Sequence, residues 1–361
     1  MGKLDKDRFQ KELGIQYCLA KGMMPFLEVI VQNTTDLTDT TETLTDLDVL
    51  GVGLKGDGVL FKTIIDCKSG NKMSAMNRAF WAAGVREYVS ADDAVIILKN
   101  TPVRSHRLSA LSLGVDLHDE TSFQDLGRVY DLGFPTKKHY QSSLEGWEKV
   151  FDAYATSGWA APLSLLVQAV APVTLEPSTT FRKVLAELRA IKGNFDPNKP
   201  SHVAILLDCV ASVMVLWSTM ARDIRRFYDP KMDRTLFEHT LRYYLWGGKE
   251  AYTIRQQLSE KLPGMERPRA VELPQWDLLV QFAGVIVAAP NSAINSAFLA
   301  KEAAIKALVP ADPVSDASVN KRLEADKNAR TLCKLVLKYL VLSCQLPREF
   351  LAATDKIIDS F

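Results

Sequence analysis

Cysteine is scarce in this chain of 361 residues, and no two cysteines form a CxxC pair. The five that occur are odd in number and far apart: Cys18, Cys67, Cys209, Cys333 and Cys344. A disulfide framework or a zinc site would need paired or closely spaced cysteines. The pattern instead favours reduced, mostly buried thiols in a cytoplasmic protein.

An excess of charge of either sign is also missing. Lys and Arg number 44 against 43 Asp and Glu, so the formal net charge is +1. A strongly basic chain would be attracted to nucleic acid or membranes without specificity. Any nucleic-acid site on this chain must therefore be a local patch.

Several well-known catalytic motifs are absent from the sequence. The chain has no G-x-x-x-x-G-K-[ST] loop, no G-x-G-x-x-G turn followed by a helix and no G-x-S-x-G elbow. We therefore do not expect ATP hydrolysis. The histidines do not cluster at metal-ligand spacing and are interpreted as structural or surface residues: His106, His118, His139, His202 and His239.

A clear membrane span and a signal peptide are lacking as well. The most apolar window, residues 203–220, contains Asp208 and is followed by Arg222, Arg225 and Arg226. It is short for a membrane span, so we interpret it as a buried core helix. The charged segment 1–14 lacks the apolar stretch of a signal peptide. We expect a soluble cytoplasmic protein without membrane contact.

The sequence pattern changes once along the chain. Up to about residue 138 helical and strand-like patterns mix, and from 142 onwards the periodicity is helical. No repeat of fixed period supports a solenoid. The sequence therefore predicts an α/β domain at 1–138 and a helical domain at 142–361, with the boundary near 135–143.

The elements expected in the first part are a helix at 7–21, a strand at 26–31, a loop at 33–43, strands at 45–54 and 59–66 around the turn Lys55-Gly56-Asp57-Gly58, a helix at 72–86, a strand at 94–98, a helix at 105–113 and a strand at 115–117. The helices expected in the second part are 144–155, 162–171, 181–191, 201–227, 234–262, 276–288, 294–308, 318–344 and 347–360.

Acidic residues interrupt the two apolar runs of the predicted hairpin. Positions two apart on a strand share a face, so Asp66 and Lys68 lie on one side, and Asp48 can lie beside them on the neighbouring strand. Two carboxylates this close repel unless a cation separates them. Mg²⁺ suits such a place because it takes oxygen ligands and keeps several waters. Lys68 would then orient or deprotonate a metal-bound water, which favours phosphodiester hydrolysis.

The order of helix, loop, TDLDVLG, DCK and a helix with Arg78-Ala79-Phe80-Trp81 resembles the PD-(D/E)xK nuclease superfamily. The segments TDLDVLG and DCKSG are similar to the corresponding motifs of Mrr-like and Holliday-junction-resolvase-like nucleases. The resemblance covers the first third of the chain, and Leu47 stands where the motif has proline. It implies a restriction-endonuclease-like core of order αβββαβ, followed here by a large all-α domain.

The resemblance also implies the site residues. Mg²⁺ or Mn²⁺ would be held by Asp48, Asp66 and the backbone carbonyl of Cys67, with Lys68 as a catalytic residue. The family often adds a Glu from the first helix, for which Glu12 is the first candidate and Glu28 the second. Two residues of the helix after the motif would contact phosphates, although a solvated helix face is the alternative: Lys72 and Arg78.

We therefore expect a metal-dependent endonuclease acting on nucleic acid, with DNA as the expected substrate, in DNA processing or phage defence. A two-fold dimer would suit the cutting of both strands. One alternative is a non-catalytic nuclease-like scaffold whose helical domain binds a partner, and another is a nuclease active only inside a protein complex. Arginines and aromatics between 222 and 246 could bind nucleic acid, but we prefer a role in shielding the helical core.

Overall fold

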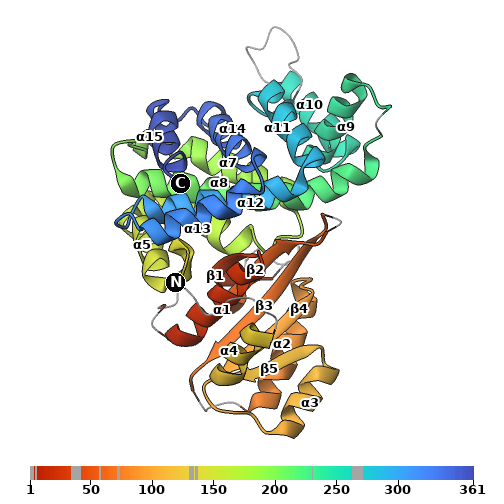
Figure 1. The fold of residues 1–361 in the computed structure, drawn as a ribbon. Coiled ribbons are helices and arrows are strands. Elements are labelled where there is room, and N and C mark those ends of the chain that lie inside the picture. The colour runs from red at the N-terminus through yellow and green to blue at the C-terminus, as the bar shows by residue number, and fades with distance from the viewer. Residues whose placement is uncertain are drawn as a thin grey trace.

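The structure is a computed structural model that describes residues 4, 6–33, 42–56, 58–70, 74–129, 134, 137–229, 231–261 and 271–361. Within these residues a mixed five-stranded sheet is followed by a large helical region, as Figure 1 shows. The predicted α/β class, with a sheet in the first part and helices in the second, is confirmed.

The sheet has the strand order β1-β2-β3-β4-β5. Its first three strands are antiparallel to one another, and β4 and β5 continue parallel to β3. The strands are β1 (Met24–Gln32), β2 (Thr43–Leu54), β3 (Leu60–Lys68), β4 (Asp93–Leu98) and β5 (Val115–Asp119). Between and after them lie α1 (Arg8–Ala20), α2 (Ala75–Tyr88), α3 (Arg104–Ser112) and α4 (Glu120–Val129).

The β2–β3 hairpin forms where the sequence predicts it. The backbone N–H of Lys55 donates to the Val59 carbonyl, and Gly58 adopts a left-handed φ of 74° that a side chain would strain. The pairing runs from Leu54 with Leu60 to Val49 with Ile65. This register fixes which acidic residues of the two strands face each other.

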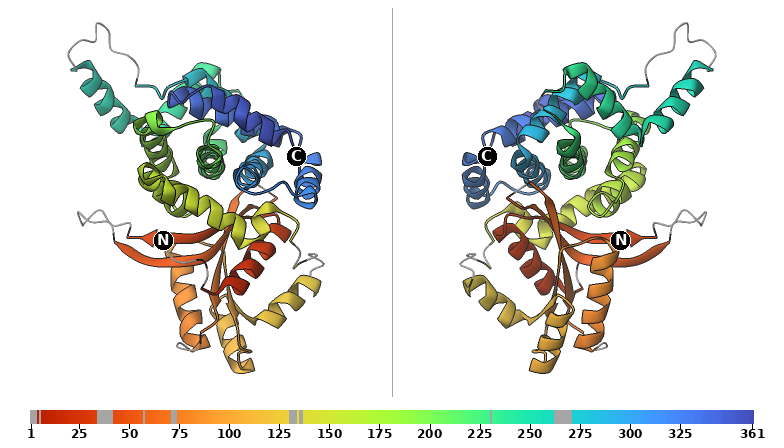
Figure 2. Two further views of the ribbon diagram at one scale, coloured as in Figure 1. Left: turned by 90° about the vertical axis from the view of Figure 1, so that its left-hand side faces the viewer. Right: turned by 90° about the vertical axis from the view of Figure 1, so that its right-hand side faces the viewer.

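Helices cover both faces of the sheet. On one face lies α1, whose Gly14 allows a close approach: a Cβ there would be 3.2–3.3 Å from side-chain atoms of Ile65 and Val49. On the other face α2 and α3 pack over β4 and β5 through small residues that include Ala79, Ala82 and Ala110. Figure 2 shows the two layers on either side of the strands. The helix α4 was not among the predicted elements.

The helical region contains eleven described α-helices. They are α5 (Leu144–Thr156), α6 (Ala161–Ser164), α7 (Pro177–Ala190), α8 (Pro200–Phe227), α9 (Arg234–Trp246), α10 (Lys249–Glu260), α11 (Trp276–Ala288), α12 (Pro290–Lys306), α13 (Pro313–Glu324), α14 (Asn328–Ser343) and α15 (Glu349–Ile358). A π-helical segment, Leu165–Val170, follows α6, and short 3₁₀ turns lie at Tyr140–Ser142, Gly158–Ala160 and Lys192–Asn194.

Two of the predicted long helices are wrong, because each is a pair of helices. The segment 234–262 breaks at Gly247, whose left-handed φ of 81° ends α9. The segment 318–344 breaks between α13 and α14, where the carboxylate of Asp326 accepts hydrogen bonds from Ser292 and Asn295 of α12. Both breaks need a conformation or a contact that apolar periodicity does not reveal.

The longest helix, α8, forms the centre of the helical region. It packs against α5, α7, α11, α12 and α14. Among the described helices it has the length and apolar composition to cross a membrane, as would α11 and α12 together across a bend of 112°. In α8, 94% of the most apolar window is buried inside the protein, which agrees with the predicted core helix.

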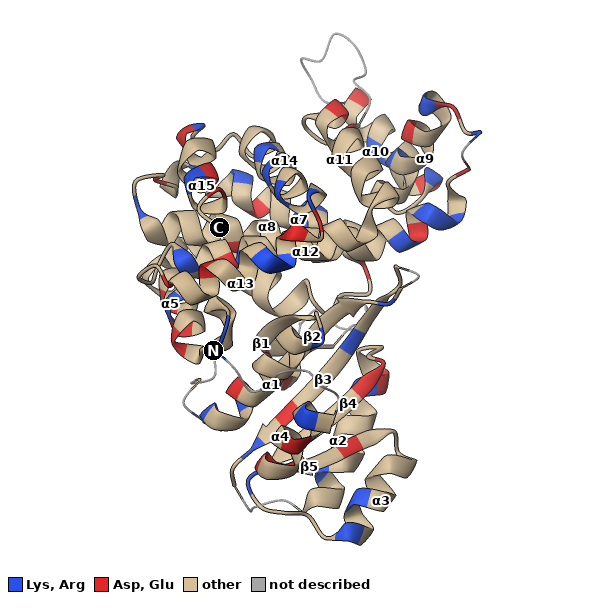
Figure 3. Cartoon of the chain, in the orientation of Figure 1, with Lys and Arg blue, Asp and Glu red and all other residues tan. Residues whose placement is uncertain are grey.

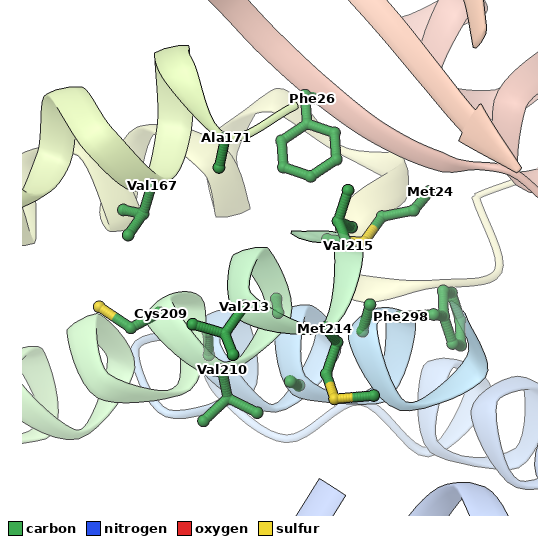
Figure 4. Close-up of a cluster of buried hydrophobic side chains, with 14 of the residues drawn as sticks. Met24, Phe26, Val167, Ala171, Cys209, Val210, Val213, Met214, Val215 and Phe298 are labelled. Carbon is green, nitrogen blue, oxygen red and sulfur yellow. The ribbon is translucent and has the colours of Figure 1, made fainter. Parts of the chain in front are cut away.

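The sheet and the helices share one hydrophobic core. Figure 4 shows Met24 and Phe26 of β1 beside Val215 of α8 and Ala171. Each of these side chains is at most 3% exposed. Because apolar contacts cross from β1 to the helices, the edge of the sheet that carries the acidic residues is tied to the helical region.

Candidate functional site

Three acidic residues lie in one row across the first three strands. Glu28 of β1 lies between pairs that join Leu27 with Val49 and Val29 with Leu47, so it stands opposite Asp48. Asp48 in turn lies one residue beyond the Val49–Ile65 pair, and the same register places it opposite Asp66. Residues opposite each other on paired strands point to the same face. The expected approach of Asp48 and Asp66 is therefore present.

Lys68 lies at the centre of the acidic residues. Its Nζ is 3.3 Å from Asp48 Oδ2, 4.0 Å from Asp66 Oδ1 and 3.7 Å from Oδ2 of Asp7, which precedes α1. Burial alone would lower the pKa of Lys68, but the carboxylates of Asp48 and Asp66 outweigh it and raise that pKa. The side chain is thus an ammonium at neutral pH. We call Asp7, Glu28, Asp48 and Asp66 the acidic cluster.

Asp48 is fixed by the backbone of the neighbouring strand. Its Oδ2 accepts a hydrogen bond of 2.8 Å from the backbone N–H of Cys67. The Cys67 side chain is fully buried, and burial followed by the charges of Asp48 and Asp66 raises the pKa of its thiol well above the usual range. A thiolate ligand is therefore disfavoured at Cys67, while the expected contribution of its backbone carbonyl stays a prediction.

Asp66 is held by an arginine of α2. Arg78 donates from Nε at 2.8 Å and from Nη2 to the two oxygens of Asp66, and its guanidinium lies 4.7 Å from the centre of the Trp81 ring. Burial raises the pKa of Asp66 to about 6, opposed by the Arg78 charge and supported by Asp48. Arg78 was expected to contact phosphates, whereas here it is bound to a proposed metal ligand. Lys72 lies outside the described residues.

The structure does not bring Glu12 into the acidic cluster. Its carboxylate accepts a hydrogen bond from the Leu144 N–H at the start of α5, 3.4 Å away, and pairs with Lys137 at 3.2 Å. Successive residues of a helix point about 100° apart, so Lys11 faces the acidic cluster and Glu12 faces α5. The choice of Glu12 over Glu28 is corrected: Glu28 is the glutamate beside Asp48.

Glu28 is tied to α1 through a buried lysine. Lys11 Nζ lies 2.5 Å from Glu28 Oε1 and 3.7 Å from Asp48 Oδ1. Burial raises the pKa of Glu28, although the Lys11 contact opposes the shift. The backbone of Glu28 has a φ of 51°, which is uncommon for a residue with a side chain and tends to persist at functional positions.

Asp7 is the member of the acidic cluster that the sequence did not reveal. It precedes α1 with a left-handed φ of 58°, and its Oδ1 accepts hydrogen bonds from the backbone N–H and the hydroxyl of Ser69, at 2.6 and 2.5 Å. Its Oδ2 is buried without a hydrogen bond and faces Lys68. A polar residue before a predicted helix was the available signal, but it commonly means only a helix cap.

The side chains of the acidic cluster suit a divalent metal ion in one respect and oppose its binding in another. Among the described residues, no three His, Cys, Asp or Glu side chains converge as a ready metal-binding group. Asp48 and Asp66 do face each other, and Mg²⁺ commonly uses one or two carboxylates and completes its shell with water. The cationic side chains of Lys68 and Arg78 show that the site accepts positive charge, but Arg78 must leave Asp66 to admit a metal.

Four of the five arginines between 222 and 246 have partners within the protein. Arg222 lies 3.2 Å from Asp223, and Arg225 donates to the Gly58 carbonyl at 2.7 Å. Arg242 pairs with Glu272 at 2.6 Å and lies over the Trp276 ring. These contacts agree with the preferred interpretation that this surface shields its own core.

Comparison with known proteins gives no match to a protein-family model, to a curated protein or to a solved structure. The function is therefore inferred from the sequence and from the geometry of the acidic cluster.

Proposed function

We propose that this protein is a metal-dependent phosphodiesterase that cleaves nucleic acid, with DNA as the first substrate to test. One observation carries the proposal: Asp48 and Asp66 face each other on paired strands, with Lys68 Nζ 3.3 and 4.0 Å from their oxygens. Two carboxylates and an ammonium at one strand end are the groups needed to hold a divalent ion and a phosphate together.

The order of the elements supports a restriction-endonuclease-like core. The chain runs α1, β1, β2, β3, α2, β4, with the acidic residues on β2 and at the end of β3. This is the αβββαβ order of the PD-(D/E)xK resemblance. It leaves β5, α3 and α4 as additions at the far edge of the sheet.

In this proposal Asp48, Asp66 and the carbonyl of Cys67 would hold Mg²⁺ or Mn²⁺. When bound, such an ion polarises the phosphate and lowers the pKa of a water. Lys68 acts as an ammonium that donates hydrogen bonds to phosphate oxygens, because its carboxylate neighbours raise its pKa. Asp7 and Glu28 hold Lys68 and, through Lys11, Asp48 in place.

A cleavage assay on the Asp66→Ala variant tests the proposal. Plasmid, linear and single-stranded DNA and RNA are incubated with Mg²⁺, Mn²⁺ or EDTA. We expect metal-dependent cutting by the wild type and a loss of more than ~100-fold in the cutting rate of the variant. Removing a residue that only supports a metal ligand typically costs about 10- to 100-fold, so a larger loss indicates a direct ligand. Asp125→Ala removes an exposed acid of α4 and should cut like the wild type. Equal cutting by wild type and Asp66→Ala would contradict the proposal.

A non-catalytic scaffold remains the second candidate, and one observation favours it. Both oxygens of Asp66 are bound by Arg78, and Glu28 is paired with Lys11, so two acids of the cluster already have cationic partners. The scaffold predicts no Mn²⁺ binding in calorimetry. Binding of Mn²⁺ without cutting would instead indicate a nuclease that needs a partner protein, and sedimentation would test the two-fold dimer.

A further inference from the structure

The carboxyl ends of the parallel strands place basic residues next to the acidic cluster. Lys68 ends β3, and the backbone N–H of Lys99, just after β4, donates to the Lys68 carbonyl at 3.0 Å. Lys99 is exposed. The backbone therefore places an exposed lysine one strand away from Lys68, at the same edge of the sheet.

Beyond Lys99 the surface is hollowed between α3 and β5. This hollow, which we call the α3 groove, has a volume of about 630 Å³ and is lined by residues that include Thr101, Arg104, Arg107, Asp116 and His118. Arg104 and Arg107 are exposed, and α3 carries no acid. Figure 3 shows basic residues on α3 at the end of the sheet domain.

The cations of this surface are free to meet a ligand. In the described part of the chain, no ion pair or side-chain hydrogen bond engages Lys99, Arg104 or Arg107. Arg78, the arginine of α2 beside the acidic cluster, is bound to Asp66. Asp116 is the one acid lining the α3 groove, so positive charge prevails there.

The distances suit a polyanionic strand. Neighbouring strands lie about 4.8 Å apart, so Lys99 is one strand spacing from Lys68. Arg104 is the fifth residue after Lys99, so the two Cα atoms lie no more than about 17 Å apart. That span corresponds to no more than about five phosphates of one duplex strand. Three exposed cations within this span can meet successive phosphates of one strand.

We infer that the surface formed by Lys99, Arg104 and Arg107 binds the phosphate backbone of a duplex whose scissile phosphate lies at Lys68. The inference rests on the proposed function and names the path of its substrate. The backbone leaves the acidic cluster over the end of β4 and follows the first turn of α3. Leu108 and Leu111, which are exposed along the α3 groove, would border this path without reading bases.

The test is binding of a fluorescein-labelled duplex DNA, followed by anisotropy in EDTA so that cutting cannot occur. The full-length variant Arg104→Ala/Arg107→Ala should bind about 10-fold more weakly than the wild type at 100 mM salt. The slope of log affinity against log salt should be smaller by about two. Lys183→Ala/Lys338→Ala removes two exposed charges from α7 and α14 and should behave as the wild type.

Each outcome decides something. Unchanged affinity and salt slope in the arginine variant overturn the inference, as does the absence of any duplex binding by the wild type. Arginine-dependent binding without cutting supports the binding surface while the proposed nuclease fails. Cutting by the wild type with an unaffected arginine variant supports the nuclease and overturns the path over α3. Loss of binding only in the variant Leu108→Ser/Leu111→Ser would show that the α3 groove takes an apolar ligand. That result would also overturn the inference.

Discussion

At the scale of single residues, the acidic cluster is a balance of buried opposite charges. Asp7, Asp48 and Asp66 surround Lys68, and Glu28 holds Lys11. Buried carboxylates are costly unless each finds a cation or a hydrogen bond. Here each has one, which explains how a sheet edge packed against helices retains so many charges.

Arg78 is the cation whose removal should change metal binding most. In Arg78→Gln the guanidinium that competes with a metal for Asp66 is gone. At pH 8 we therefore expect Mn²⁺ to bind about 10-fold more tightly. This factor corresponds to the low end of the free energy that a hydrogen bond to a charged group contributes. The pKa of Asp66, about 6, should rise because Arg78 lowers it. The pH below which Mn²⁺ binding weakens should rise with it. Calorimetry from pH 5 to 8 measures both effects.

Arg86→Gln is the matched control. It removes another arginine of α2, one that donates to the Gly114 carbonyl far from the acidic cluster. Its Mn²⁺ affinity and pH dependence should equal those of the wild type. If Arg78→Gln also left both unchanged, Arg78 would not compete with the metal, and the proposed ligand role of Asp66 would lose its support.

At the scale of elements, a glycine decides where the helix α9 stops. The break between α9 and α10 depends on Gly247, which has a left-handed φ and an open space of at least 4 Å where a Cβ would lie. Such a site tests backbone conformation alone, because a side chain would meet no neighbour.

Gly247→Ala should therefore lower the free energy of unfolding by about 1 kcal/mol, the cost of a left-handed conformation with a Cβ. Gly284→Ala is the control, since Gly284 lies inside α11 with no atom within 4 Å of an added Cβ. There alanine should raise stability by about 0.5–1 kcal/mol through helix propensity. Urea unfolding of both variants checks the opposite signs; a stabilised Gly247→Ala would show that the break does not need glycine.

At the scale of the whole molecule, a buried ion pair lies in the core that joins the sheet to the helices. Asp208 of α8 and Lys301 of α12 are paired at 0% and 1% exposure, and Lys301 lies 5.8 Å from the ring of Phe26 in β1. Tyr154 and Gln168 donate to Asp208 at 3.1 and 3.3 Å. The sequence showed Asp208 only as a break in an apolar window.

Removing one partner of this pair leaves the other charged and buried. We expect Lys301→Met or Asp208→Asn alone to lower the free energy of unfolding by about 3–5 kcal/mol. The double variant should lose much less than the sum, because no unpaired charge remains. Urea unfolding of the four proteins measures the coupling. Additive losses would mean that the pair does not interact as the geometry indicates.

Much of the molecule could be predicted from local patterns. Apolar alternation located β1, β2 and β3, the Gly-Asp-Gly turn located the hairpin, and the spacing of two along a strand placed Asp66 and Lys68 on one face. These features depend on neighbours in the chain, so local preferences are enough to specify them.

Tertiary structure alone decided the rest. The rotation of α1 brings Lys11 rather than Glu12 to the acidic cluster, Ser69 draws in Asp7, and α2 places Arg78 on Asp66. Each of these contacts joins residues from different elements, and packing rather than sequence spacing sets the angle between those elements. The sequence by itself determined the strands and the pairing of Asp48 with Asp66. Which other charges surround that pair depended on how the helices pack against the sheet.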